Sequence, residues 1–384
     1  MRKQTMIVFF LIVFTVYILA NLYLFLKGYR AIPVLQKHKL IYSLTFSVLA
    51  AVFIVAKFLE SRHSSVITDA LNILGGFWLA FMLYGFLFFI VSDLIFLILR
   101  IPNIINHDNI AVYRKCSFII ILTGSSGLII GGFINAVIPV VKEYNITINK
   151  QAGDIKTLRI AAVSDIHLGS IIRKRSMNKL SDILLKLKPD LVLLLGDIVD
   201  GEIGPVLRGD LLQYFNCPKC EHGLLAISGN HEFIGGADRT IPYIESKGIR
   251  LLKDEIVTLD GSIQFIGRND RDSERFYGKK RMPLADLISK TDPAKPIILL
   301  DHQPFHYDEA VKYGVDLELS GHTHNGQMWP LNHITAMIYE LSYGYMKKGN
   351  SQFIVSSGYG LWGPRVRSAS RSEVLLINVN FSGN

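Results

Sequence analysis

The feature that most constrains this chain is a set of four apolar runs within its first 149 residues. A run of about 20 such residues is long enough to cross a bilayer as a helix, the form in which a segment satisfies its own backbone polar groups. The first could be a signal peptide, but it is longer than the apolar core of such a signal, and more spans follow. We therefore predict an all-α transmembrane region at residues 1–149, with spans of about 6–26, 40–59, 71–92 and 117–141.

The third apolar run is longer than one bilayer thickness and is interrupted by Asp93. We predict that Asp93 lies at the interface or beyond it. A buried intramembrane carboxylate with a functional role is the alternative. The fourth run contains glycines that suit close helix packing, namely Gly124, Gly127, Gly131 and Gly132.

The basic charge of the chain is unevenly distributed. Residues 1–149 carry 12 Lys/Arg and 5 Asp/Glu, a net charge of +7, whereas the remainder carries 29 and 27, a net charge of +2. Flanking positive charge is normal for membrane segments, so we expect no nucleic-acid partner. We predict a multi-pass protein of the cell membrane. The loop charges, seven against six, favour the C-terminal domain on the outer side.

The rest of the chain alternates between strand and helix patterns. Residues 142–156 form a polar connector, and we assign 150–384 to one layered α/β domain. The expected strands end at residues 163, 195, 228, 266, 300, 320 and 356, with a last strand at 374–379. Helical patterns fill 176–187, 238–247, 284–290 and 307–313.

Polar, chemistry-bearing residues follow five of these strands. They stand in the motifs Asp165-Ile166-His167, Gly196-Asp197, Gly229-Asn230-His231-Glu232, Asp301-His302 and Gly321-His322-Thr323-His324. Residues at the carboxyl ends of strands face the crevice where open α/β sheets bind ligands. A single Asp-x-His is weak evidence of a site, but an ordered set of five is not expected by chance.

Imidazoles and carboxylates without cysteine suit Zn, Fe or Mn. The candidate ligands are Asp165, His167, Asp197, Asn230, His302, His322 and His324. Seven ligands exceed one tetrahedral site and predict two divalent ions that share a carboxylate. Two ions about 3.5–4 Å apart suit in-line phosphoryl displacement.

The pair Cys217 and Cys220 has the spacing of half a zinc site, but no second half is present. A local disulfide or two thiols is the preferred interpretation.

The motif set resembles that of the calcineurin-like metallophosphoesterases over residues 156–380. The resemblance implies a four-layer αββα sandwich. It implies a first metal held by Asp165, His167, Asp197 and His324, and a second held by Asp197, Asn230, His302 and His322. Asp197 would bridge the two ions. His231 would protonate the leaving group, and Asp200, three residues after Asp197, would orient His231.

Other stretches, including Gly360 to Arg367, are similar to bacterial membrane-associated phosphodiesterases such as the YaeI and YkuE proteins. That branch includes enzymes that cleave the pyrophosphate of UDP-diacylglucosamine. Arg365 and Arg367 are candidate substrate-binding residues, because arginine suits bidentate phosphate contacts. The basic run Arg173 to Arg175 is suited to an anionic substrate or a lipid surface.

We therefore expect a membrane-anchored enzyme that hydrolyses a phosphodiester or pyrophosphate bond. Its partners would be a phosphate-ester substrate and the bilayer, and a lipid-linked substrate is the working hypothesis. Two alternatives are a protein Ser/Thr phosphatase and a membrane sensor whose domain binds ligand without turnover.

Overall fold

The computed structural model describes residues 2–215 and 220–383, and the chain forms two compact units. The first comprises Met1–Leu59 and Ala70–Gly131, and the second comprises Glu60–Asp69 and Gly132–Asn384. Cys217 lies outside the described residues, so the predicted Cys217–Cys220 pair has no structural description here.

The N-terminal part is helical, as predicted. Its elements are α1 (Arg2–Ala31), α2 (Pro33–Lys37), α3 (Lys39–Arg62), α4 (Val66–Arg100) and α5 (Ile110–Val137). Four of them, all except α2, are long and apolar enough to cross a membrane. The predicted fourth span extends too far, because α5 ends at Val137 and a strand starts after Pro139, which has no N–H for a helical hydrogen bond.

The structure gives the contacts of Asp93 and of the helix glycines that the sequence singled out. The carboxylate of Asp93 forms an ion pair with Lys27 and accepts a hydrogen bond from Tyr23. A Cβ at Gly124, Gly127 or Gly131 would meet nothing within 4 Å, so these glycines do not mediate close packing within the described chain. A Cβ at Gly75 would lie 2.6 Å from the Cα of Phe53, so the close approach is between α3 and α4.

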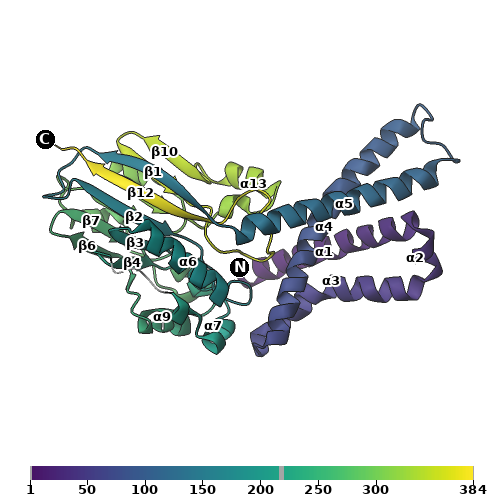
Figure 1. Ribbon diagram of the computed structural model, residues 1–384, viewed down its shortest axis with the longest axis horizontal. Helices are drawn as coiled ribbons and strands as arrows, with labels where there is room; N and C mark the ends of the chain where they lie inside the picture. The colour runs from purple at the N-terminus through teal and green to yellow at the C-terminus, as the bar shows by residue number, and fades with distance from the viewer. Residues whose placement is uncertain (1, 216–219, 384) are drawn as a thin grey trace. The chain divides into compact units, whose positions relative to one another are not determined.

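The second unit contains two six-stranded sheets (Figure 1). The first has the order β1-β12-β2-β3-β4-β5 and the second β10-β11-β9-β8-β7-β6. The strands of the first sheet are β1 (Val140–Ile148), β12 (Glu373–Phe381), β2 (Thr157–Val163), β3 (Leu191–Leu195), β4 (Leu224–Ile227) and β5 (Leu251–Leu252). Those of the second are β10 (Gly344–Lys348), β11 (Ser351–Val355), β9 (Leu317–Ser320), β8 (Ile297–Leu300), β7 (Ile263–Gly267) and β6 (Glu255–Leu259).

The hydrophobic clusters show that the unit is a four-layer αββα sandwich, which confirms the predicted fold. One cluster fills the space between the sheets and joins Leu193 of β3 with Leu300 of β8. A second packs the outer face of the first sheet under α6 (Lys174–Leu187), α7 (Gly204–Gly209) and α9 (Ala237–Ser246), which Figure 1 shows together. A third packs the outer face of the second sheet under α11 (Leu284–Ile288) and α12 (Tyr307–Lys312). The remaining α-helices of the unit are α8 (Asn230–Ile234), α10 (Asp272–Tyr277) and α13 (Leu331–Ile338).

The predicted polar connector at residues 142–156 is wrong over its first half. β1 pairs in parallel with β12 along its whole length and forms the edge of the first sheet. Its polar residues Lys142 and Glu143 are exposed, while Ile146 and Ile148 are buried between the sheets. An edge strand with one solvated stretch lacks the continuous apolar run of a central strand, which is why it was not predicted.

The connection between α3 and α4 packs within the second unit. Asp69 forms ion pairs with Arg173 and Arg208, and Ser170 donates a hydrogen bond to Glu60. Arg173, predicted to meet an anionic ligand, is therefore already paired with a carboxylate of its own chain.

Candidate metal centre

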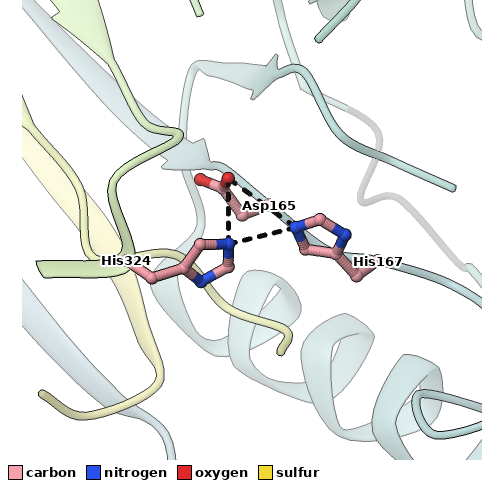
Figure 2. Close-up of side chains that lie close together, drawn as sticks. All are labelled: Asp165, His167 and His324. Carbon is pink, nitrogen blue, oxygen red and sulfur yellow. Dashed lines mark hydrogen bonds and ion pairs between the residues drawn. The ribbon is translucent and has the colours of Figure 1, made fainter. Parts of the chain in front are cut away.

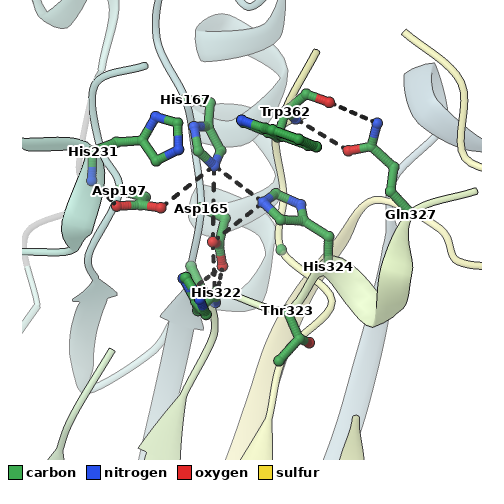
Figure 3. Close-up of polar contacts among 12 residues, drawn as sticks. Asp165, His167, Asp197, His231, His322, Thr323, His324, Gln327 and Trp362 are labelled. Carbon is green, nitrogen blue, oxygen red and sulfur yellow. Dashed lines mark hydrogen bonds and ion pairs between the residues drawn. The ribbon is translucent and has the colours of Figure 1, made fainter. Parts of the chain in front are cut away.

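The five motifs meet at one place, because each follows the carboxyl end of a parallel strand. β2, β3 and β4 are neighbours in the first sheet, and β8 and β9 are neighbours in the second. The loops after these strands bring the seven predicted ligands and His231 into one cluster, much of which is drawn in Figure 3. The predicted ligands are buried or nearly so.

The first group of side chains consists of Asp165, His167 and His324 (Figure 2). His324 Nε2 lies 3.4 Å from Asp165 Oδ1, and His167 Nε2 lies 3.8 Å from the same oxygen. The two Nε2 atoms are 3.1 Å apart. Three ligand atoms from two sheets therefore point at a common centre.

The second group consists of Asp197, His302 and His322, with Asn230 beside them. His302 Nε2 lies 3.1 Å from Asp197 Oδ2, and His322 Nδ1 lies 2.8 Å from Asn230 Oδ1. Asp197 Oδ2 is also 3.6 Å from His167 Nε2, which belongs to the first group. Asp197 Oδ2 thus lies between the two groups and closer to His302 Nε2 than Asp165 Oδ1 does, at 3.1 Å against 4.0 Å.

The backbone at these positions is strained. Asp165, His167, Asp197, His322 and His324 all have positive φ values between 49° and 71°. Residues other than glycine rarely adopt this left-handed region, although Asp, Asn and His do so more readily than most. Such strain costs about 1–3 kcal/mol per residue and is concentrated at functional sites. The tight turns aim the side chains inward, so that two ligands of one loop can reach the same centre.

The chemistry of the cluster fits divalent cations. His302 donates from Nδ1 to the Leu195 carbonyl at 2.7 Å, which directs its buried Nε2 toward the Asp197 carboxylate, 3.1 Å away. Neutral imidazole nitrogens and carboxylates that converge away from water need a proton or a cation between them. These residue types at these positions suit Zn, Fe or Mn.

The charges of the cluster are strongly coupled. Burial opposes ionisation of Asp165, but the facing imidazoles of His324 and His167 hold its pKa well below its usual range. Burial also disfavours the charged form of His302, yet Asp197 and Asp165 raise the pKa of its imidazole well above the usual value. Burial, together with His302, lowers the pKa of His322 to about 4. Protons on some imidazoles balance the carboxylates here, and a bound cation would displace them.

His231 differs from the predicted ligands in its position. Its side chain is 13% exposed, whereas those of His167 and His302 are at most 1% exposed. Its backbone N–H donates to Asp197 Oδ1 at 2.8 Å, and its ring meets that of His167 edge-on at 4.6 Å between centroids. Asp200 Oδ1 lies 3.1 Å from His231 Nδ1 and 3.4 Å from His167 Nδ1. His231 is thus an imidazole held at the rim of the cluster beside a carboxylate.

Glu232 is a structural member of the site that the sequence analysis did not single out. Its buried carboxylate accepts hydrogen bonds from the backbone N–H groups of Asp197, Val199 and Gly229. These contacts fix the β3 and β4 loops against each other. Burial and the nearby Asp197 raise the pKa of Glu232 to about 7. The available signal was a capping box, since Glu232 stands three residues after the helix cap Gly229.

The predicted substrate contact by Arg367 is not what the structure shows. Its side chain is fully buried and donates to the carbonyls of Gly358 and Gly360 at 3.2 and 2.6 Å. Its Nη2 also lies 3.1 Å from His324 Nδ1, on the side of the ring away from the other ligands. Arg367 is therefore a positioning residue behind His324. Arg365 points elsewhere, with its guanidinium 5.4 Å from the Phe133 ring centroid.

We expect Arg367→Met to lower the thermal stability of the protein. The substitution leaves the buried Gly360 carbonyl without this donor, at a cost of about 1–3 kcal/mol, while the Gly358 carbonyl keeps its hydrogen bond from the Glu373 N–H. The melting temperature of the full-length protein in detergent measures the effect. Arg371→Met is the matched control, because Arg371 lies in the same loop but is exposed. Equal melting temperatures for the two variants would contradict the structural role of Arg367.

Comparisons with known proteins agree with this geometry. The family model for calcineurin-like phosphoesterases matches residues 158–326. A metallophosphoesterase of Aquifex aeolicus is 31% identical over 230 residues, which are 59% of this chain and 87% of the relative. A transmembrane protein with a metallophosphoesterase domain from Danio rerio is 26% identical, over 68% of this chain and 62% of its own length.

A more distant relative is the UDP-2,3-diacylglucosamine pyrophosphatase LpxG of Chlamydia trachomatis. It is 24% identical over 62% of this chain and 88% of the relative. The apolar helices and the transmembrane relative indicate a multi-pass membrane protein. The strand-end motifs, the paired ligand groups and the Aquifex relative together establish that the chain belongs to the calcineurin-like metallophosphoesterases, and it is therefore a metal-dependent phosphoester hydrolase.

Proposed function

We propose that this protein hydrolyses a phosphodiester or pyrophosphate bond in a lipid or lipid-linked substrate, using two divalent ions. The first ion would be held by Asp165, His167, Asp197 and His324, and the second by Asp197, Asn230, His302 and His322. The observation that carries the proposal is the position of Asp197 Oδ2, 3.6 Å from His167 Nε2 and 3.1 Å from His302 Nε2. A carboxylate between two ligand groups is what a bridged pair of ions requires.

Such ions, Mn, Fe or Zn by ligand type, would supply Lewis acidity that activates water and stabilises the charge of the transferring phosphoryl group. The protein's own contribution is positional. Asp200 holds His231 at the rim, with its ring able to face a substrate. From there His231 would give a proton to the leaving-group oxygen. Glu232 and Arg367 would keep the ligand loops in place.

Two observations support a lipid-linked substrate, while the resemblance to the YaeI/YkuE-like branch rests on the sequence motifs alone. The globular unit follows α5 directly, so the catalytic residues are tethered to an apolar helix long enough to cross a membrane. Trp362, in the loop that also holds Arg367, is 58% exposed, and its backbone is fixed by the Gln327 side chain (Figure 3). An exposed indole at the edge of the cluster suits an amphiphilic ligand. Loop charges favour the outer side of the membrane for this domain.

The test compares two pyrophosphates that differ only in acylation. Full-length protein in mild detergent is incubated with UDP-diacylglucosamine or UDP-N-acetylglucosamine, with Mn²⁺, Fe²⁺ or Zn²⁺ and with chelator, and with bis-p-nitrophenyl phosphate as a generic diester. We expect metal-dependent turnover that is faster for the acylated compound. Cleavage of the soluble compounds alone would remove the lipid proposal. Metal binding without turnover of any of them would instead favour a sensor.

A further inference from the structure

A cavity in the globular unit is lined by none of the proposed metal ligands. It has a volume of about 410 Å³ and lies between the last turn of α5, the start of α6 and the loop around residue 365. Its basic side chains are those of Arg175, Lys179 and Arg365. Its apolar wall includes Phe133, Val137 and Ile138. No Asp or Glu is among the described residues that line it.

The walls of this cavity are held together by direct contacts. The Arg367 N–H donates to the Gly132 carbonyl at 2.9 Å, and the Asn135 side chain donates to the Arg367 carbonyl at 3.1 Å. A Cβ at Gly132 would lie 2.5 Å from Val366, so this glycine permits the close approach of α5 to the loop. Lys179 donates from α6 to the Val137 carbonyl at the end of α5. The positions of α5, α6 and the loop around this cavity are therefore fixed by specific contacts.

The cations of the cavity are poorly neutralised. Within residues 2–215 and 220–383, neither Arg175 nor Arg365 has an ion-pair partner, and the buried Nε of Arg365 has no acceptor. Both guanidinium groups line the cavity, and burial together with the neighbouring Arg175 lowers the pKa of Arg365. An anion bound between the exposed Arg175 and the partly buried Arg365 would stabilise both charges.

The position of the cavity favours the phosphate of a lipid over a free phosphate. Phe133 and Val137 belong to the final turn and a half of α5, a helix whose apolar length is sufficient to cross a membrane. Basic side chains directly beyond such a helix lie at the height of lipid head groups. The apolar wall suits the hydrocarbon next to a head group, which a free phosphate does not have.

We propose that this cavity binds the phosphate group of an anionic membrane lipid, with Arg175 and Arg365 as its principal contacts. The site is separate from the metal centre and does not depend on its proposed activity. It would hold the start of the globular unit against the lipid surface.

Lipid binding by the full-length protein tests this proposal. The protein is purified in a neutral detergent and titrated with phosphatidylglycerol, and bound lipid is counted by native mass spectrometry. We expect Arg175→Gln/Arg365→Gln to weaken the tightest binding event by roughly tenfold to thirtyfold, the usual contribution of two basic side chains near an anionic lipid. Arg175→Gln alone, at an exposed position on α6, should show part of the loss without affecting folding.

Three controls make the result specific. Arg239→Gln changes an exposed arginine on α9 and should bind like the unmodified protein. Arg30 and Arg114 line a different cavity, which lies in the helical unit. The variant Arg30→Gln/Arg114→Gln measures how much lipid binds at that cavity. Asp197→Asn should retain lipid binding, which separates this site from the metal centre. Unchanged binding in the double variant, or an equal loss in the Arg239 control, would overturn the proposal.

A competition arm distinguishes lipid from free phosphate. Inorganic phosphate and glycerol 3-phosphate are added to the lipid-loaded protein. We expect neither to displace the lipid, because they lack the chains that contact the apolar wall. Displacement by inorganic phosphate in the unmodified protein, absent in Arg175→Gln/Arg365→Gln, would assign the cavity to a soluble phosphate and overturn the lipid assignment.

Discussion

Asp197→Asn should abolish metal-dependent phosphoester hydrolysis, lowering kcat/KM by at least about a hundredfold, since even changes to residues behind metal ligands cost 10- to 100-fold. The substitution keeps the shape of the side chain but removes the negative charge that two ligand groups share. Asparagine tolerates the positive φ of 51° at this position, and its Oδ1 can still accept from the His231 N–H. The fold should therefore survive while the metals are lost.

The measurement combines kinetics with metal content. Full-length Asp197→Asn is assayed with bis-p-nitrophenyl phosphate under saturating Mn²⁺, and retained metal per chain is determined by elemental analysis. Asp182→Asn is the matched control, because Asp182 is exposed on α6 and outside the cluster. A variant that keeps two ions per chain and near-normal turnover would show that Asp197 does not bridge.

His231→Gln should separate proton donation from metal binding. Removal of a general acid typically lowers the rate by about 10²–10⁴-fold. The full loss is expected for a substrate whose leaving group needs a proton, such as an alkyl phosphodiester. A p-nitrophenolate leaving group departs without protonation, so the loss with bis-p-nitrophenyl phosphate should be much smaller. Metal content should stay at the unmodified level, because His231 lies at the exposed rim.

Asp200→Asn should also slow hydrolysis of the alkyl phosphodiester, but by less than His231→Gln does. Asp200 lies 3.1 Å from His231 Nδ1 and would act only through the orientation of that ring and of His167. We expect a decrease in kcat of about 10- to 100-fold for the alkyl substrate. In the double variant with His231→Gln the two losses should not add, since both report on one proton donor. Additive losses, or loss of metal in His231→Gln, would contradict the assigned roles.

Much of the fold and site could be predicted from local patterns. The apolar runs indicate segments whose backbone hydrogen bonds can all be made within a helix, and α1, α3, α4 and α5 each overlap one of the four runs. The strands that precede Asp197 and His302 are continuous apolar runs buried on both faces, and the strand before Asp165 is apolar and buried over its last four residues. Parallel strands place their carboxyl ends at one edge, so the clustering of the motifs follows from their order in the chain.

Other features depend on packing between distant segments. β1 pairs with β12 across more than two hundred residues, and its mixed polarity gives no local sign of that edge position. The contact of His167 with His324 joins residues 157 positions apart on different sheets. The left-handed backbone at Asp165 and His322 is imposed by the tertiary contacts of the loops, since an isolated chain would not favour it.

Arg365 and Arg367 show the difference between what the local sequence predicts and what tertiary packing determines. Both are arginines, so the sequence predicts phosphate binding equally for each. The sequence gives the chemistry of a side chain but not the direction in which it points. Packing of the loop against Gly132 and His324 turns Arg367 into the core and leaves Arg365 beside Arg175 at the end of α5. Local pattern determines which backbone states and side-chain chemistries are available. The direction in which each side chain points is decided by close packing, which involves residues far apart along the chain.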